Sequence, residues 1–277
     1  VLFRSQALAA VSLAFPITTL MNALSVWIGV GVNVLIAGYL GQKNQQKANS
    51  AAALGVVISV VVGVLINFLS LFIINPYYSA FTQNKEIFEY GIAYMSVCVF
   101  MQIPNMVHIV IQKILQATGN MIAPMWFQIA GVVFNFVFDP LLIFGIGPFP
   151  KMGVAGAALA TVIAQMVVTL AFVLAIRKDT VIFDKIRLLS RPSRLHMNTI
   201  VKIGIPMCIQ SLIFTGISMF IARIIAGWGD AAVAVQKVGS QIESICWMTA
   251  DGFSAAVNSF VGQNYGAGNI KRVKKGY

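Results

Sequence analysis

Charge is the scarcest property of this 277-residue chain. Only 10% of its residues are charged and only eight are Asp or Glu, whereas about 25% of the residues in a typical soluble domain are charged. With 58% apolar residues and a mean hydropathy of +0.85, the chain has too few polar groups to cover a water-facing surface. The composition therefore excludes a soluble enzyme and indicates an integral membrane protein.

Residues that carry catalytic or metal chemistry are also scarce. The three cysteines (Cys98, Cys208 and Cys246) lie inside apolar runs without disulfide or metal-ligand spacing, and there are two histidines. The chain has no H-E-x-x-H, no G-x-S-x-G and no P-loop. We therefore expect neither an enzyme nor an ATP-driven pump, and no bound cofactor.

What the chain has instead is a series of long apolar runs. Each is long enough to cross a hydrocarbon core of about 30 Å as a helix, which favours α-helical spans over a β-barrel. The seven runs cover residues 8–38, 51–74, 88–111, 121–145, 153–176, 201–226 and 232–262. The sequence thus predicts an all-α, polytopic helical bundle, with kinks at Pro16, Pro104 and Pro206.

The basic residues are unevenly distributed between the connections. Fourteen of the 19 Lys and Arg residues fall on one side of the predicted membrane and three on the other. We read the net charge of +11 as a sign of topology rather than of nucleic-acid binding. The larger group comprises Lys43, Lys47, Lys113, Arg177, Lys178, Lys185, Arg187, Arg191, Arg194, Lys202, Lys271, Arg272, Lys274 and Lys275. By the positive-inside rule, residue 1 lies outside and the C-terminal end lies in the cytoplasm. This outside start, at Val1 rather than Met, leads us to expect a fragment that lacks a preceding helix.

The basic segment 177–200 predicts a cytoplasmic linker between two bundles, an N-lobe at 1–176 and the start of a C-lobe at 201–277. A weak internal repeat supports this division, because a shift of 225 residues aligns two apolar helices that each end in a Gly/Asn/Gln-rich turn followed by Lys or Arg. The aligned pairs are Asn33 with Asn258, Gly41 with Gly266, and Asn44 with Asn269. A six-helix repeat preserves orientation, so the lobes would be parallel repeats.

A carboxylate in the run 121–145 is the clearest candidate for function. Asn135 and Asp139 are four residues apart and share a helix face, and a carboxylate at the centre of a membrane helix costs about 2.5–3.5 kcal/mol. Pro140 removes a backbone donor and exposes a carbonyl one turn earlier. Oxygen ligands of this kind suit Na⁺, and the carboxylate alone suits a proton. The alternative is that Asp139 ends a helix before a proline.

A second group of polar residues lies in the last two runs. Glu243, Trp247 and Asp251 fall on roughly one side of a helix, where they could attract a lipophilic cation. The structural alternative is an ion pair with Lys237 or Arg223. Gln210 is a polar residue of the preceding run and a further candidate for the substrate cavity.

The two histidines have no metal-ligand spacing. We expect His108 to form a packed hydrogen bond, with Gln102 and Asn105 as candidate partners, rather than to relay protons. His196 falls in the basic linker and is expected to be solvated.

Four stretches together carry a resemblance: "QKILQATGNMIAPM", "NFVFDPLLIFG", "MGVAGAALATVIAQ" and "QIESICWMTADGFSAAVNSFVGQNYGAGNIKR". In this order and spacing the chain resembles the bacterial branch of the multidrug and toxic compound extrusion (MATE) family. The resemblance implies twelve helices in two six-helix lobes, of which this chain would hold helices 2 to 8. It also implies a monomer in the inner membrane that exports cationic or amphiphilic compounds in exchange for Na⁺ or H⁺, with no nucleic-acid partner.

The resemblance further assigns residues to the N-lobe. Asn135 and Asp139 would line a cation site, and Thr161 in "GAALATVIAQ" would be a third ligand, although its hydroxyl could instead bond its own helix backbone. The run 201–226 has no acidic residue, so a second-lobe Na⁺ site based on a Glu there is not expected.

Two other functions stay open. A flippase for lipid-linked precursors would share this architecture but usually needs a more basic central cavity. A seven-helix receptor or membrane enzyme would fit the number of spans but not the 225-residue repeat.

Overall fold

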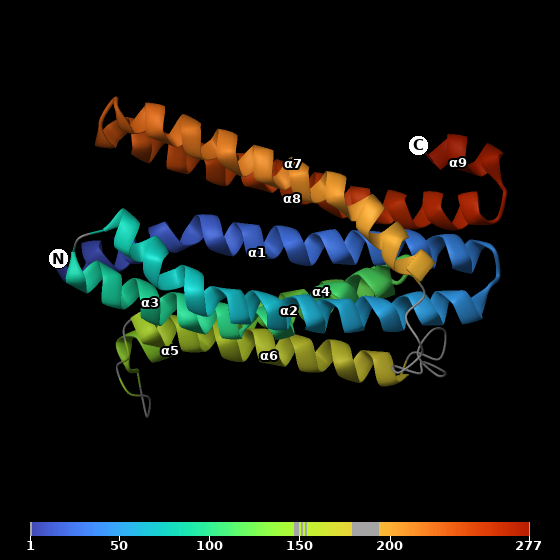
Figure 1. Cartoon of the computed structure of the whole chain (residues 1–277), viewed down its shortest axis with the longest axis horizontal. Helices are drawn as coiled ribbons and strands as arrows, with labels where there is room; N and C mark the ends of the chain where they lie inside the picture. Colours follow the sequence, from blue (N-terminus) through green and yellow to red (C-terminus); the bar gives the residue numbers. More distant parts are fainter. Residues whose placement is uncertain are drawn as a thin grey trace.

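The computed structural model describes residues 2–82, 84–146, 150, 152, 154–178 and 194–276. The described chain forms helices joined by short turns. Their bounds are α1 Leu2–Gly41, α2 Gln45–Phe81, α3 Lys85–Phe100, α4 Gln102–Ala117, α5 Ile122–Phe144, α6 Val154–Lys178, α7 Arg194–Ala226, α8 Asp230–Gly266 and α9 Ile270–Gly276. Figure 1 shows the long helices running side by side. The predicted helical bundle is confirmed.

Helices occupy all seven predicted apolar runs. Within the described residues, four stretches are long and apolar enough to cross a bilayer, namely Leu13–Gly41, Gln45–Phe81, Ile122–Phe144 and His196–Ile225. The pair α3 and α4 makes a fifth if it counts as one span. In α6 the described apolar part is the shorter segment Leu159–Ala175.

The predicted helix at 88–111 is two helices. α3 and α4 meet at Met101 with a bend of 41°. Pro104 lies in the first turn of α4, where its missing N–H removes a backbone hydrogen bond that would have continued α3. The prediction of a kink near Pro104 is confirmed, whereas Pro16 and Pro206 lie inside continuous helices.

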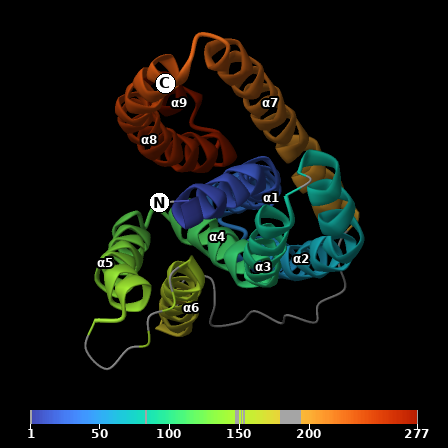
Figure 2. The ribbon, with the colours of Figure 1, turned by 90° about the vertical axis from the view of Figure 1, so that its left-hand side faces the viewer.

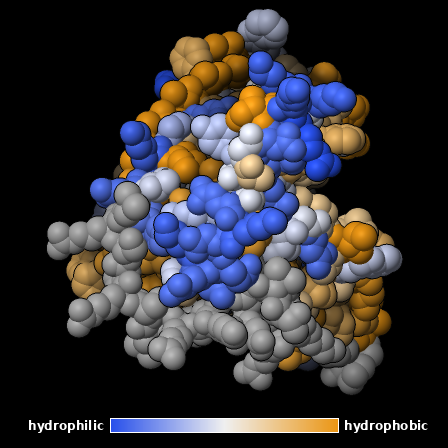
Figure 3. All heavy atoms as spheres, turned by 90° about the vertical axis from the view of Figure 1, so that its right-hand side faces the viewer, coloured by the Kyte–Doolittle hydropathy of each residue, from blue (hydrophilic) through white to orange (hydrophobic). Residues whose placement is uncertain are grey.

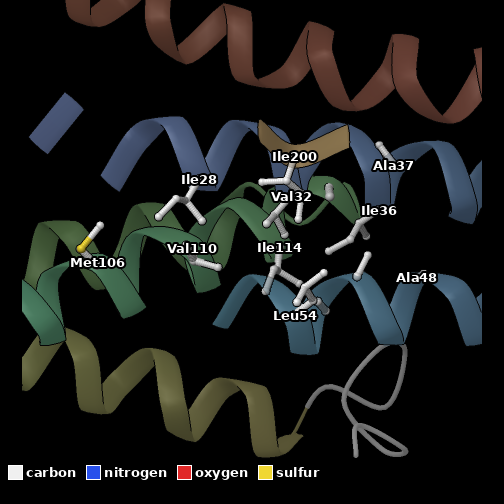
Figure 4. Packing of buried hydrophobic residues seen from close by; sticks show 13 residues of the cluster. Ile28, Val32, Ile36, Ala37, Ala48, Leu54, Met106, Val110, Ile114 and Ile200 are labelled. Carbon is white, nitrogen blue, oxygen red and sulfur yellow. The ribbon is translucent and has the colours of Figure 1, made fainter. Parts of the chain in front are cut away.

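α1 is the centre of the packing. Figure 4 shows side chains of α1, α2 and α4 meeting in one apolar cluster that includes Ile28, Val32, Val110 and Ile114, each at most 1% exposed. Ile200 joins this cluster from the first turns of α7. Figure 2 shows α1 between the helices α2–α6 on one side and α7 and α8 on the other.

The first turns of α7 fall inside the predicted linker 177–200, because α7 begins at Arg194. His196 is 6% exposed and its ring lies 5.3 Å from that of Tyr39 on α1. The expectation that His196 is solvated is therefore wrong, because the sequence pattern did not indicate that α7 starts early and packs on α1. Residues 179–193 of the predicted linker lie outside the described residues.

The 225-residue repeat is confirmed at the turns after α1 and α8. In the first turn the backbone bonds are Gln42 N–H to Gly38 O, Lys43 N–H to Leu40 O and Asn44 N–H to Tyr39 O. In the second they are Ala267 N–H to Gln263 O, Gly268 N–H to Tyr265 O and Asn269 N–H to Asn264 O. Each bond in one turn has its counterpart 225 residues away in the other. The two turns therefore have the same backbone geometry.

The two copies also contact each other. Gly41 of α1 lies against the Gln263 carbonyl of α8, and Gly266 of α8 lies against the Gly38 carbonyl of α1. A shift of 225 residues converts one contact into the other, so a local pseudo-two-fold axis passes between α1 and α8 here. Gln263 and Ser259 of α8 also donate side-chain hydrogen bonds to the carbonyls of Ala117 and Gln116 at the end of α4.

Hydrophilic side chains gather at this same end of the molecule (Figure 3). Six exposed basic residues of the two turns and of α9 belong to the end, namely Lys43, Lys47, Lys271, Arg272, Lys274 and Lys275. Lys113, which was predicted to lie in a loop with them, is instead half-buried within α4. Its side chain packs on Gly29 of α1, where the absent side chain leaves room for the lysine stem.

Candidate functional site

The segment with Asn135 and Asp139 forms one unbroken helix. α5 continues through Pro140 to Phe144 and ends at Gly145, whose backbone is left-handed (φ 71°, ψ 50°). The alternative that Asp139 ends a helix is therefore wrong. Asn135 and Asp139 lie one turn apart on the same face, in the C-terminal half of the apolar helix α5.

Both residues hold a buried oxygen without a hydrogen bond. Among the described residues, no partner reaches Oδ1 of Asn135 or Oδ1 of Asp139, and both atoms are shielded from solvent. An unpaired polar atom in such surroundings costs about 1–3 kcal/mol. Two such atoms therefore lie one turn apart on the same helix face.

α6 packs against α5 along this face. Gly131 of α5 lies against the Val168 side chain of α6, and Gly156 of α6 lies against the Leu142 carbonyl of α5. These two contacts define an antiparallel register in which Thr161 lies within two residues of the level of Asp139. The Thr161 side chain is exposed on α6.

The candidate substrate residues lie on α7 and α8. Trp247 donates its indole N–H to Glu243 Oε1 over 3.0 Å, and its ring lies 5.9 Å from that of Phe214. Gln210, one turn before Phe214, lines a shallow apolar depression on α7 of about 550 Å³. The four predicted residues therefore sit on two adjacent helices, with Asp251 one turn beyond Trp247.

Asp251 has a basic neighbour that was not predicted. It is exposed on α8 and within electrostatic range of Lys113 on α4. The sequence suggested Arg223 or Lys237, of which Arg223 is exposed on α7 and the Lys237 side chain lies outside the described residues. The sequence could not indicate this proximity, because it depends on the packing of α4 and α8 on α1.

The partner of His108 is Gln165 of α6. The Gln165 amide nitrogen lies 2.5 Å from His108 Nδ1, and the imidazole stacks on Phe172 at 5.9 Å. The predicted packed hydrogen bond is confirmed, but neither predicted partner makes it. Gln102 instead donates to the Met21 carbonyl and to Ser25 Oγ.

In the part of the chain that the structure describes, no group of three His, Cys, Asp or Glu side chains is placed to bind a metal ion. Fold and site together define a multi-span helical membrane protein with polar groups buried in its spans.

Comparison with known proteins gives the family. The family model MatE matches residues 2–141 and 206–277. An FAD transporter of Shewanella oneidensis is 27% identical over 98% of this chain and 60% of its own length. A probable multidrug resistance protein NorM of Thermotoga maritima is 28% identical over 97% of the chain and 58% of its own.

Solved structures agree. A crystal structure of MATE in complex with MaL6 superposes with a TM-score of 0.91 at 27% identity, covering 98% of this chain and 60% of that one. The chain belongs to the MatE family, whose members are membrane transporters rather than enzymes. It spans about 60% of the length of the curated relatives that it matches.

Proposed function

We propose that the protein is a secondary active antiporter that exports organic cations in exchange for Na⁺ or H⁺ by alternating access. The observation that carries this proposal is the pair of buried, unpartnered Oδ1 atoms of Asn135 and Asp139 on one face of α5. Coupled exchange needs a site inside the membrane that can hold a small cation in one state and release it in another. A buried carboxylate is the simplest such site.

The surroundings suit either coupling ion. Pro140 leaves the Phe136 carbonyl without its usual helical donor, because proline has no N–H. Together with the side-chain oxygens of Asn135, Asp139 and Thr161, this carbonyl would offer Na⁺ several oxygen ligands, which hard cations prefer. For a proton, the Asp139 carboxylate alone suffices.

The substrate would bind between the lobes. Asp251 and Glu243 supply negative charge on α8, and Trp247 supplies an aromatic face for a lipophilic cation. The relative from Shewanella is an FAD transporter, and FAD carries negatively charged phosphates. The experiment must therefore compare a cationic substrate with FAD. The acidic residues on α8 support a cation over FAD or a lipid-linked precursor.

The proposed orientation in the membrane follows from the basic residues at one end of the molecule. The turns after α1 and α8 would lie on the cytoplasmic side of the inner membrane, because the exposed lysines and arginines gather there. The N-lobe then comprises α1–α6 and the C-lobe begins with α7, in a monomeric transporter.

The test is efflux with Asp139→Asn. The protein is expressed from its complete reading frame, reconstituted into vesicles, and assayed for transport of the fluorescent cation ethidium under an imposed Na⁺ gradient or pH gradient. We expect at least a roughly 10-fold loss of gradient-driven transport, equivalent to about 1.4 kcal/mol. Wild-type rates under both gradients would remove Asp139 as the coupling residue.

Glu86→Gln is the matched control. Glu86 is an exposed carboxylate in the first turn of α3, outside the α5–α6 pair. Its loss should leave the coupled rate unchanged. Transport of FAD rather than ethidium by the wild-type protein would contradict the proposed substrate class. The coupling site would then be tested by the effect of Asp139→Asn on FAD transport.

A further inference from the structure

Helix α4 carries a row of polar side chains that reach several neighbouring helices. We name Gln102, Asn105, His108 and Gln112 the α4 polar row. Gln102 reaches α1, Asn105 reaches both α1 and α6, His108 faces α6, and Gln112 accepts a hydrogen bond from Gln128 of α5 at 3.2 Å. The row is therefore the point at which four helices of the N-lobe are hydrogen-bonded together.

One branch of the row forms a continuous chain of amides. Gln165 Nε2 of α6 donates to Asn105 Oδ1 of α4 over 3.3 Å. Asn105 Nδ2 then donates to Asn22 Oδ1 of α1 over 3.1 Å. Because each amide donates to the next, the chain has a direction, from α6 through α4 to α1.

The chain begins beside the proposed cation site. Thr161 precedes Gln165 by one helical turn and lies on the same face of α6. The register set by Gly131 with Val168 places Gln165 level with Phe134 on α5, one residue before Asn135. A displacement of α6 that accompanies cation binding at Asn135, Asp139 and Thr161 therefore acts on Gln165 directly.

The chain ends on the helix that bridges the two lobes. α1 packs on α2, α3 and α4 of the N-lobe and also on α7 and α8 (Figure 2). Gly31 of α1 lies against the Ile200 backbone of α7, and Gly41 lies against α8. A movement of α1 would therefore reach the surfaces where the lobes meet.

We infer that Gln165 is a positioning residue that couples the cation site of α5 and α6 to α1 through Asn105 and Asn22. The inference rests on the proposed function. Gln165 does not bind the cation itself. It holds α6 to α4, so that occupancy of the cation site changes the position of α1 and hence the affinity of the substrate region between the lobes.

The test measures coupling rather than amount of folded protein. Purified protein from the complete reading frame is titrated with ethidium with and without Na⁺, and at a higher and a lower pH. Coupled sites typically change each other's affinity by roughly 5- to 150-fold. In the wild-type protein, the ethidium Kd should differ between the two Na⁺ conditions or between the two pH values. We expect Gln165→Leu to bring the ratio of these two Kd values close to one. Binding of Na⁺ or of a proton in the absence of ethidium should be retained.

Three further variants keep the test decisive. Asn22→Leu cuts the same chain at its exposed end, and the double variant with Gln165→Leu should lose no more coupling than either single variant. Gln128→Leu removes a different hydrogen bond to the α4 polar row and should keep the wild-type ratio. A wild-type ratio in both Gln165→Leu and Asn22→Leu, or an equal loss in Gln128→Leu, would overturn the inference.

Failure of the proposed function gives a different result. If Asp139→Asn keeps the wild-type ratio of ethidium affinities, the cation site is wrong, and the inference is overturned together with it. If Asp139→Asn loses the ratio and Gln165→Leu keeps it, the site stands and the role of Gln165 is refuted.

Discussion

The carbonyl oxygen of Gly38 lies so close to the backbone of Gly266 that a Cβ atom at Gly266 would overlap it. The pseudo-equivalent contact joins Gly41 to the carbonyl of Gln263. Small residues at helix crossings in membranes allow this kind of backbone approach. Because the two contacts are related by the 225-residue repeat, α1 and α8 form a nearly symmetric crossing that closes the basic end of the molecule.

Gly266→Ala is expected to open this crossing. The new Cβ would overlap the Gly38 carbonyl, and overpacking of this kind costs about 1–3 kcal/mol. Spin labels at Gln42 and Ala267, which are exposed equivalents in the two turns, should report a longer mean distance in Gly266→Ala and in Gly41→Ala. Gly38→Ala is the control, since a Cβ there meets nothing within 4 Å. An unchanged distance in Gly266→Ala would contradict a role for the close crossing.

Lys43→Gly is expected to stabilise the protein. Lys43 has a left-handed backbone with φ 57°. Its equivalent in the second turn is Gly268 with φ 73°, and glycine has no side chain that would strain this conformation. The left-handed conformation costs a non-glycine residue about 1 kcal/mol, which corresponds to a rise in Tm of about 2–4 °C for a chain of this size. Thermal unfolding in detergent measures it. The reciprocal change Gly268→Ala should lower Tm by a similar amount, and a fall in Tm for Lys43→Gly would refute the explanation.

The proposed orientation is tested by chemical labelling. In a background with Cys98, Cys208 and Cys246 replaced by Ala, single cysteines are placed at Lys43, Lys271 and Glu86. A membrane-impermeant maleimide should label Glu86→Cys in intact cells, and Lys43→Cys and Lys271→Cys only after the membrane is permeabilised. The opposite pattern would reverse the proposed topology.

Much of the fold could be predicted because apolar run length and loop charge are local properties. The helix through Pro140 follows from the continued apolar run in "LLIFG", and the pairing of Asn135 with Asp139 follows from a spacing of four residues. The 225-residue repeat was visible in a few Gly and Asn pairs, since the turns that they form need the same backbone conformation.

What could not be predicted depends on contacts between distant segments. Lys113 reads as a loop residue because it follows an apolar run, yet Gly29 of another helix makes room for its side chain. His196 reads as part of a polar linker, yet it is buried against Tyr39. The partner of His108 lies 57 residues away, at Gln165, which no local pattern indicates.

Asn135→Leu should distinguish coupling to Na⁺ from coupling to H⁺. Na⁺ needs several oxygen ligands, so Asn135→Leu removes one ligand and should weaken Na⁺ binding. A proton needs only the Asp139 carboxylate, so proton coupling should survive the same change. We expect Asn135→Leu to reduce ethidium transport driven by a Na⁺ gradient by roughly 10-fold, equivalent to about 1.4 kcal/mol, and to leave transport driven by a pH gradient near the wild-type rate. Equal loss under both gradients would indicate that Asn135 serves the packing of α5 on α6 rather than the ligation of a metal ion.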